Sequence, residues 1–375
     1  MAKVQSVLIV GGGIGGLALS VGLRQAGIDA DVVEIKKQWA IYHVGIIVES
    51  NFIRALLQLG LADRAVAAGF PYNGIRYCDA NGNVFKEPPN ANLAGPGYPL
   101  TLGLTRPALH KVLFDASQEW GARVRLGLTI ADFKQSADKV AVKFTDGSSG
   151  EYDLVVGADG VHSQIREMLF GDKYVPKYTG EGVWRYSVPR PPDLDHGLLY
   201  VSREGPKSGL IPLTQESAYI FRIGPEPANH HFPHAELANT LRDRLKLFGG
   251  VIGKLSAHIT DPDQVVYRPL WSVLVSPPWY QGRVVLLGDA THSITPHLGQ
   301  GAAQAVEDVV VLAEVLQKDA PLEELLDAFV ERRYERCKFI LQASLQLGEW
   351  EQHPDPKADP ISLWNEVERV IVQPI

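Results

Sequence analysis

The chain opens with SVLIV-GGGIGG over residues Ser6–Gly16, and this stretch decides the fold class. An apolar run too short for a helix leads into glycines, and the residues after Gly16 are again apolar at helical spacing. This pattern is typical of a buried parallel strand that turns sharply into a helix. Within G-x-G-x-x-G, Gly11 permits the tight turn, Gly13 lets a pyrophosphate touch the backbone, and Gly16 brings helix against strand.

An acidic residue follows at the offset that this type of loop requires. The segment Ala30–Glu34 predicts a second strand, and its last residue lies ~20 residues beyond the glycines. We expect Glu34 to accept hydrogen bonds from ribose hydroxyls and to repel a 2′-phosphate. The helix start between the two strands offers unpaired N–H groups to phosphates. Strand, glycines, helix, strand and acid together predict dinucleotide binding, although they leave open which dinucleotide binds.

Bulk properties restrict the class of protein. A chain of 375 residues exceeds the usual size of one hydrophobic core, so two or more lobes are expected. Apolar residues make up 45% and charged residues 21%, as in an ordinary soluble globule. The net charge of −7 comes without acidic or basic blocks, which argues against nucleic acid and anionic membrane as partners.

The cysteines and the apolar segments indicate the compartment. Cys78 and Cys337 have neither C-x-x-C nor metal-ligand spacing, so we expect no metal site and a reducing cytoplasm. The short apolar run at the start lacks the charged leader and cleavage site of a signal peptide. No segment has the ~20 apolar residues that span a bilayer. We therefore expect a cytoplasmic protein.

The remaining pattern predicts further elements in chain order. A helix is expected over Asn51–Gly60, a hairpin around Asn81-Gly82, and a helix beginning at Thr105. Beyond Phe170 the pattern becomes mainly β, which marks a second lobe. The other expected elements are strands at Val124–Ile130, Val140–Thr145, Tyr152–Gly157 and Val284–Leu287, helices at Ala235–Phe248, Ala302–Leu316 and Leu322–Glu349, and a final polar tail.

Two arginines at or near helix starts receive different interpretations. Arg106 begins a helix, where a cation opposes the helix dipole unless an anion compensates it. A dinucleotide phosphate or a flavin edge would be that anion, and a salt bridge to a nearby acid is the alternative. Arg54 is interpreted as a solvated helix residue. Gly45 and Ile46, in the loop after the ribose-binding acid, are expected to face the ligand.

Three separated motifs resemble those of the single-component (class A) flavoprotein aromatic hydroxylases, the family of p-hydroxybenzoate, salicylate and urate hydroxylases. They are the glycine loop with Glu34, the segment Asp153–Arg166, and Gly288-Asp289-Ala290 followed by Pro296 and Gly299-Gln300-Gly301. The motifs occur in family order and cover nearly the whole chain. The resemblance implies FAD as cofactor and NADH or NADPH as transient electron donor. It also implies hydroxylation of a small aromatic or N-heteroaromatic substrate, carboxylated or phenolic, by O2 through a flavin C4a-hydroperoxide.

Pattern and resemblance together predict an α/β fold: a Rossmann-like FAD-binding domain, an inserted, mainly β substrate domain, and a C-terminal helical segment. The FAD-binding domain is expected to be discontinuous. Its expected boundaries are residues 1–72, 100–172 and 268–335, those of the β-sheet substrate domain are 73–99 and 173–267, and those of the C-terminal helix and tail are 336–375.

The resemblance also implies which residues hold FAD. Glu34 holds the adenosine ribose, Ile130 contacts the adenine half, and Asp289 binds the ribityl chain or the pyrophosphate. A helix beginning at Gly301 stabilises negative charge on the reduced ring. Relatives read Ala-Asn where this chain has Ala302-Ala303, so one flavin hydrogen bond is in doubt. The full expected set is Gly11, Gly13, Ile14, Gly15, Gly16, Glu34, Gly45, Ile46, Arg106, Ile130, Asp159, Asp289, Pro296, Gly299, Gln300, Gly301 and Ala302.

Strand alternation and the urate hydroxylase pattern suggest the substrate side. Arg185 would bind a substrate carboxylate bidentately, and Tyr219 or His297 would assist removal of a phenol proton, so these three are the catalytic candidates. The alternatives are a paired structural cation for Arg185, core packing for Tyr219, and a hydrogen-bonded loop residue for His297; His292 is interpreted as structural. The expected substrate contacts are Arg185, Lys207, Tyr219, Phe221, Pro296 and His297.

Rival functions remain. Another flavoenzyme on the same scaffold, such as a halogenase, an epoxidase or a reductase, is the first, because Trp184–Pro189 reads W-R-Y-S-V-P and is near the halogenase W-x-W-x-I-P. An NAD-dependent dehydrogenase is disfavoured by the second and third motifs. A non-enzymatic FAD protein is the third alternative. The expected partners are the small substrate and O2, and the expected assembly is a monomer or a homodimer.

Overall fold

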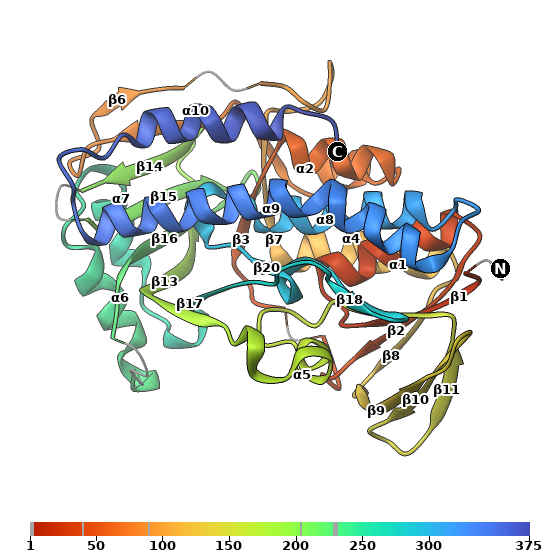
Figure 1. The fold of residues 1–375 in the computed structure, drawn as a ribbon. Helices are drawn as coiled ribbons and strands as arrows, with labels where there is room; N and C mark the ends of the chain where they lie inside the picture. The colour runs from red at the N-terminus through yellow and green to blue at the C-terminus, as the bar shows by residue number, and fades with distance from the viewer. Residues whose placement is uncertain (1–3, 40, 89–90, 203–204, 228–231) are drawn as a thin grey trace.

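The computed structural model describes residues 4–39, 41–88, 91–202, 205–227 and 232–375 (Figure 1). It is a mixed α/β fold with two main sheets. The first sheet is six-stranded, in the order β18-β19-β12-β1-β2-β8. Its strands are β1 (Ser6–Val10), β2 (Asp29–Glu34), β8 (Arg123–Leu126), β12 (Leu154–Gly157), β18 (Tyr280–Gln281) and β19 (Val284–Leu286).

The register of the first sheet brings the three sequence motifs to one edge. β1 pairs in parallel with β2 and β12, and β12 pairs in parallel with β19. The carboxyl ends of these strands lead into the glycine loop, Glu34, Asp159 and Asp289. Glu34 and Asp289 follow strands that are three positions apart in the sheet, which places them about 14 Å apart at the usual strand spacing. Ligands of open α/β sheets bind outside this edge.

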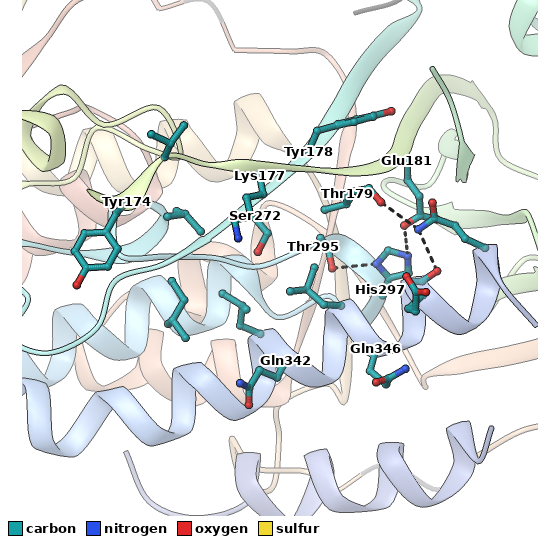
Figure 2. A pocket seen from close by; sticks show the side chains of 18 of the residues that line it. Tyr174, Lys177, Tyr178, Thr179, Glu181, Ser272, Thr295, His297, Gln342 and Gln346 are labelled. Carbon is teal, nitrogen blue, oxygen red and sulfur yellow. Dashed lines mark hydrogen bonds and ion pairs between the residues drawn. The ribbon is translucent and has the colours of Figure 1, made fainter. Parts of the chain in front are cut away.

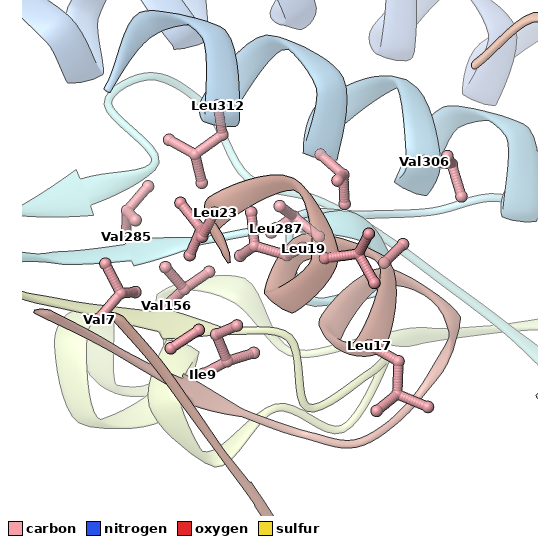
Figure 3. Packing of buried hydrophobic residues seen from close by; sticks show 14 of the residues in the cluster. Val7, Ile9, Leu17, Leu19, Leu23, Val156, Val285, Leu287, Val306 and Leu312 are labelled. Atoms are coloured by element: carbon pink, nitrogen blue, oxygen red, sulfur yellow. The ribbon is translucent and has the colours of Figure 1, made fainter. Parts of the chain in front are cut away.

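The core of this sheet is apolar on both faces, as parallel strands between helices require. Helices α1 (Ile14–Gln25) and α8 (Gly301–Val315) contact each other and cover one face. Figure 3 shows strand residues such as Val7 and Val285 facing Leu23 and Leu312 of these helices, and all four are fully buried. This packing fixes where the first turn of each helix begins relative to the strand ends.

The second sheet is eight-stranded, in the order β20-β17-β13-β16-β15-β14-β5-β6. One face packs on α6 (Leu237–Leu245) and α7 (Gly250–Leu255) through Trp184 and Tyr186. The strands are β5 (Ile75–Cys78), β6 (Val84–Lys86), β13 (Lys177–Pro189), β14 (Gly197–Val201), β15 (Lys207–Pro212), β16 (Ser217–Pro225), β17 (Val266–Leu274) and β20 (His292–Ser293).

Alternation within β13 and β16 defines the opposite face of this sheet. Arg185 pairs with Phe221, and Ser187 pairs with Tyr219, so these side chains lie on the same face as Val183. Val183, Tyr219 and Phe221 form a separate apolar cluster with partly buried Ile47 of β3 (Gly45–Glu49). This face of the second sheet, which we call the β lobe together with α6 and α7, therefore packs against the segment that follows Glu34.

One long helix connects the two regions. α9 (Leu322–Gln352) packs beside α8 and also contacts β16, and it runs along the molecule in Figure 1. The other elements are α2 (Ser50–Gln58), α3 (Ala62–Ala67), β4 (Phe70–Tyr72), β7 (Thr101–Thr105), α4 (Arg106–Glu119), β9 (Ile130–Gln135), β10 (Val140–Phe144), β11 (Ser149–Tyr152), α5 (Gln164–Phe170), short 3-10 turns that include Gly288–Ala290 and Pro296–Leu298, and α10 (Pro360–Ile371).

Most sequence-based elements are confirmed, and three are wrong. The expected strand Val124–Ile130 is divided between β8 and β9, because Gly127 has a φ of +74° that no strand continues through. The expected helix Ala235–Phe248 is shorter, and α7 follows it. The supposed polar tail contains α10, which packs on α9. Among the described residues, no helix is both long enough and apolar enough to cross a membrane.

Candidate active site

The glycine loop adopts a geometry that side chains would prevent. Gly11 has a φ of +113°, and a Cβ there would lie 2.3 Å from the carbonyl oxygen of Ala158. A Cβ on Gly16 would lie 1.9 Å from the carbonyl oxygen of Gly11, whereas a Cβ on Gly13 would meet nothing within 4 Å. α1 begins after Gly13 without a side-chain cap or an acid in its first turn. Its first N–H groups are therefore open to an anion.

Glu34 also holds the loop itself. Its carboxylate accepts hydrogen bonds from the backbone N–H of Gly12 and Lys36, each at 3.0 Å. A carboxylate has about four acceptor sites, so capacity remains for ribose hydroxyls. Sequence reasoning missed two rings beside this loop: the ring centroids of Trp39 and His110 lie 4.4 Å apart, and His110 Nε2 lies 3.1 Å from the Gly12 oxygen.

A second open helix start lies at α8. Gly299, with a φ of +65°, turns the chain into it, and α8 has no side-chain cap and no acid in its first turn. A Cβ on Gly15 would lie 3.0 Å from Leu287 and 3.8 Å from Ala305, so the starts of α1 and α8 pack against the turn that carries Asp289. Two sets of unpaired amides therefore flank one carboxylate.

The Asp289 side chain is exposed, and the protein around its carboxylate desolvates it in part. This desolvation raises its pKa, against the favourable charges of His292 and Arg106. Beneath the turn, Asp308 accepts from the N–H of Gly288 at 3.0 Å and lies 2.6 Å from His292 Nε2. His292 is fully enclosed in this network, as the structural interpretation expects.

A fully buried arginine joins the two long helices under this turn. Arg333 donates to Asp308 at 2.7 Å and to Glu307 at 2.8 Å. Burial alone would raise the pKa of Asp308, but His292 and Arg333 outweigh it and lower that pKa. Glu307 also pairs with Arg54 at 3.6 Å, and Arg54 donates to the carbonyl of Ile371 at 3.0 Å. The interpretation of Arg54 as a solvated residue is therefore wrong.

Arg106 and Arg185 face Tyr219 between the two sheets. Within the described ranges, neither arginine has an ion pair or a side-chain hydrogen bond. Burial lowers the pKa of Arg106, while Tyr219 and Asp289 raise it. Burial, and to a smaller extent Arg106, lower the pKa of Arg185 to about 10 against the opposing effect of Tyr219. Two cations without a carboxylate partner favour an anionic ligand, and the expected alternatives of a salt bridge or a paired structural cation are absent from this part of the structure.

Tyr219 forms the wall between these arginines and the loop after Glu34. It is 4% exposed, its ring centroid lies 5.9 Å from that of Phe221, and a Cβ on Gly45 would lie 2.2 Å from its ring. Burial raises its pKa to about 12, although Arg185 and Arg106 lower it. The hydroxyl therefore stays protonated at neutral pH. Tyr219 packs in an apolar cluster, as its core-packing alternative expects, and its role toward a substrate stays a prediction.

The other two substrate candidates lie in a buried polar cluster. Lys207 is 5% exposed and donates to Glu351 at 2.7 Å. His297 is 6% exposed, lies 3.0 Å from Thr295 Oγ1 through Nδ1, and approaches Glu181 at 3.1 Å through Nε2. Pro296, just before it, is half-buried. Sequence reasoning missed Glu181, whose one local signal is that it is the single acidic residue of β13.

Gln300 points away from the helix start that it precedes. Its side chain accepts from Asn51 at 2.8 Å and donates to Glu49 at 3.1 Å. Burial raises the pKa of Glu49 to about 7, and Gln300 lowers it. The side chain of Gln300 therefore fixes β3 and α2 beneath the loop, while the backbone at Gly301 and Ala302 stays half-exposed.

The second motif has a structural role. The Asp159 carboxylate accepts from the backbone N–H of Gln164 at 2.8 Å and Ile165 at 3.1 Å, which caps α5. Arg166 donates to the carbonyl of Ala290, beside Asp289, at 3.0 Å. Ile130 is buried in the main core, and Ile14 and Ile46 are half-buried near the loop. The roles of all these residues toward FAD stay predictions.

The edge of the first sheet carries two uncapped helix starts and the carboxylates of Glu34 and Asp289, and these features define a dinucleotide-binding protein. A model of the FAD binding domain matches residues 4–344. The chain is 32% identical over 368 residues to the 2-heptyl-3-hydroxy-4(1H)-quinolone synthase of Pseudomonas aeruginosa, covering 96% of this chain and 92% of that protein. It is 32% identical over 345 residues to the FAD-dependent urate hydroxylase of Klebsiella pneumoniae, covering 89% and 87%.

A solved structure shows the same fold. The crystal structure of Klebsiella pneumoniae HpxO complexed with FAD and uric acid superposes with a TM-score of 0.84 at 27% identity, covering 98% of this chain and 92% of that one. The chain belongs to the FAD-binding-domain family of class A flavoprotein aromatic hydroxylases. It is an FAD-dependent monooxygenase.

Proposed function

We propose that the chain hydroxylates a small aromatic or N-heteroaromatic acid or phenol, with NADH or NADPH as electron donor. The observation that carries this proposal is the pair of arginines without carboxylate partners beside Tyr219. A buried guanidinium is costly unless an anion approaches it. A planar carboxylate or phenolate between Arg185 and the ring of Tyr219 would supply that anion and a stacking surface.

FAD fits the edge of the first sheet. Glu34 would hold the adenosine ribose, the start of α1 the pyrophosphate, and Asp289 the ribityl hydroxyls. Gly299 and the backbone N–H groups at the start of α8 would face the ring. When bound, FAD would supply the chemistry that takes electrons from the nicotinamide donor and activates O2.

Side chains of the β lobe, together with Arg106 of α4, bind and orient the substrate. Arg185 holds its negative group, and Arg106 adds positive charge next to Asp289. Tyr219 keeps its proton at neutral pH and can donate a hydrogen bond to a substrate oxygen. Phe221 and Val183 exclude water from the same face of the sheet. A phenol that loses its proton becomes a better nucleophile, so a proton acceptor is also required.

The relatives support a nitrogen-containing ring as the substrate. One is named for urate hydroxylation, another for synthesis of a hydroxyquinolone, and HpxO was crystallised with uric acid. The halogenase alternative receives no support from Trp184, because this residue is fully buried and its indole N–H donates to Glu226 at 2.9 Å. Its role is therefore structural.

A screen tests the proposal. The purified yellow protein is offered NADH or NADPH with a panel of hydroxylated and carboxylated aromatics and N-heteroaromatics. We expect at least one compound to accelerate oxidation of the donor and to gain one oxygen by mass. Colourless protein that fails to bind FAD on reconstitution, or accelerated oxidation without oxygen transfer for every compound, would refute it. The same proposal places the enzyme in the cytoplasm as a monomer or homodimer, which sedimentation and fractionation test.

A further inference from the structure

A cavity of about 790 Å³ lies between β13, β17 and α9, outside the sheet edge described above. Figure 2 shows Lys177, Tyr178 and Gln346 along it, with Glu181 and His297 at one end. We call this space the α9 cavity. Its inner end is polar and buried: Glu181 is 1% exposed and His297 is 6% exposed.

Three buried polar atoms converge at that end. They are Glu181 Oε1, His297 Nε2 and Glu351 Oε2, and among the described residues none has a hydrogen-bond partner. His297 Nε2 lies 3.1 Å from Glu181 Oε2 and 3.5 Å from Glu351 Oε2. Unpaired buried polar atoms are costly, so the cluster needs a proton or a cation between them.

The hydrogen bonds on the other side of the ring fix its tautomer. Ser344 Oγ donates its single proton to the carbonyl oxygen of Thr295 at 2.8 Å. The contact of 2.7 Å between the two hydroxyls must then use the proton of Thr295. Thr295 Oγ1 is left as the acceptor for His297 Nδ1–H, at 3.0 Å. In the neutral ring, Nε2 therefore carries the lone pair, and this atom lies 3.1 Å from Glu181 Oε2.

Charge and burial decide where the proton lies. Burial raises the pKa of Glu181 to about 7, with Lys207 and Arg222 lowering it and Glu349 raising it. Burial, and to a smaller extent Lys207, lower the pKa of His297 to about 3 against the opposing effect of Glu351. Lys207 already neutralises Glu351. One proton, carried by Glu181 and directed at His297, therefore leaves the cluster without net charge.

The cluster lies on the sheet face that also carries Arg185. Glu181 lies on the same face of β13 as Arg185, four residues away, which is about 14 Å along a strand. His297 directly follows Pro296 in the turn that leads into α8. Glu181 and His297 also line the α9 cavity. The cluster thus shares a sheet face with Arg185 and borders a space large enough for water.

We propose that Glu181, His297 and Glu351 form a proton-transfer site that holds one exchangeable proton and passes protons from the substrate face to water in the α9 cavity. A proton released by the substrate hydroxyl enters the cluster, and one proton leaves it for a water molecule, so charge and atoms balance. Glu181 acts through His297 and is a positioning residue. The transfer step rests on the proposed function, whereas the protonation of Glu181 does not.

A divalent cation is the competing occupant. One nitrogen and two carboxylate oxygens within 4.8 Å of one another would suit zinc, but the Lys207 ammonium, 2.7 Å from Glu351, repels it. Metal analysis of the purified protein, followed by titration with Zn²⁺ alone, decides between the two. One tightly bound zinc per chain, lost on substitution of His297, would overturn the proposal, and its absence supports a proton.

Infrared spectroscopy of the FAD-loaded protein tests the protonation directly. We expect the carbonyl band of a protonated carboxyl group at pH 6, fading as the pH rises through about 7. The band should be weaker in Glu181→Gln by the contribution of one carboxyl group, because Glu49, whose pKa burial also raises to about 7, keeps its own band. The full band should persist in Glu335→Gln, a matched change at an exposed α9 residue that pairs with Lys338. An unchanged band in Glu181→Gln would overturn the proposal.

The transfer step has its own readout, with a compound taken from the screen. In the native protein, the rate of aromatic-stimulated NADH oxidation should rise with pH through about 7, because the ionised cluster accepts protons. Glu181→Gln should lose this midpoint and fall by on the order of 10²-fold at pH 8. The same midpoint in the variant would overturn the relay. If no compound stimulates oxidation, the proposed function fails, and the infrared result still decides the proton site.

Discussion

Replacing Arg185 by methionine should stabilise the substrate-free enzyme while weakening its hold on anionic substrates. Burial without a carboxylate partner lowers the pKa of Arg185 from 12.5 to about 10. A shift of one pKa unit corresponds to about 1.4 kcal/mol, so the folded protein tolerates this charge at a cost of about 3 kcal/mol. Methionine removes the charge and keeps the apolar contacts of the long side chain. The cost applies throughout pH 6–9, because it is present whenever the native arginine is charged.

The expected change in melting temperature follows from chain length. For 375 residues the unfolding entropy is about 0.8 kcal/mol/K, so 3 kcal/mol corresponds to an increase of about 4 °C. Calorimetry of both proteins with the same FAD content measures it. For a carboxylated substrate, Arg185→Met should raise the KM by on the order of tenfold or more, because a charged hydrogen bond is lost.

A matched change in the neighbouring strand should have the opposite sign. Arg222 is buried, whereas Arg185 is half-buried, and Arg222 pairs with Glu226 at 2.9 Å. Arg222→Met leaves that carboxylate with less compensation and should lower the melting temperature, since breaking a buried pair costs about 3–5 kcal/mol. If Arg185→Met melts at or below the temperature of the native enzyme, the claim that Arg185 is uncompensated fails. An unchanged KM for carboxylates would remove its assignment to the substrate.

Three further predictions concern other parts of the site. The Glu181 carboxyl has a raised pKa of about 7, so between pH 4.5 and 7 the native state holds more protons than the unfolded state and loses stability as pH rises. Glu181→Gln lacks this loss, so from pH 5 to 8 its free energy of unfolding should gain about 3 kcal/mol relative to that of the native protein. Denaturant unfolding at both pH values measures this, and a constant difference would contradict it. Gly45→Ala places a Cβ 2.2 Å from the ring of Tyr219 and should abolish aromatic-stimulated NADH oxidation when the rate is expressed per bound FAD; retained stimulation would show that the ring is not a wall of the site. Asp289→Asn should weaken FAD retention on gel filtration by about tenfold, and equal retention would argue against the ribityl assignment.

Local chemistry made the first motif predictable. The chain turns at Gly11, where a Cβ would clash with Ala158. Only glycine fits this position, so the residue type alone predicts the turn. The same holds for Thr105, which caps α4 by accepting from the N–H of Ala108 at 3.2 Å. Elements whose cause lies within a few residues were therefore predicted with their approximate ends.

Residues whose partners are distant in the chain were not predictable in this way. Glu181 meets His297 more than 100 positions later, and Arg54 finds Glu307 only after α8 packs on α2. The lack of an ion pair at Arg185 is likewise a property of the assembled lobe. A single sequence shows the residue types at such positions but not the charged and polar groups that surround them in the folded protein. The candidate site could therefore be located from the motifs, whereas its protonation states could not.

The α9 helix has a mechanical consequence. Its early turns are bound to α8 through Arg333, and its last turns meet Lys207 and His297 through Glu351. A continuous helix of 31 residues is stiff along its length, so it acts as a strut that holds the β lobe at a set distance from the first sheet. Entry of a substrate then cannot depend on the two lobes moving apart. Short segments such as the turn at Pro296–Leu298 have to move locally instead.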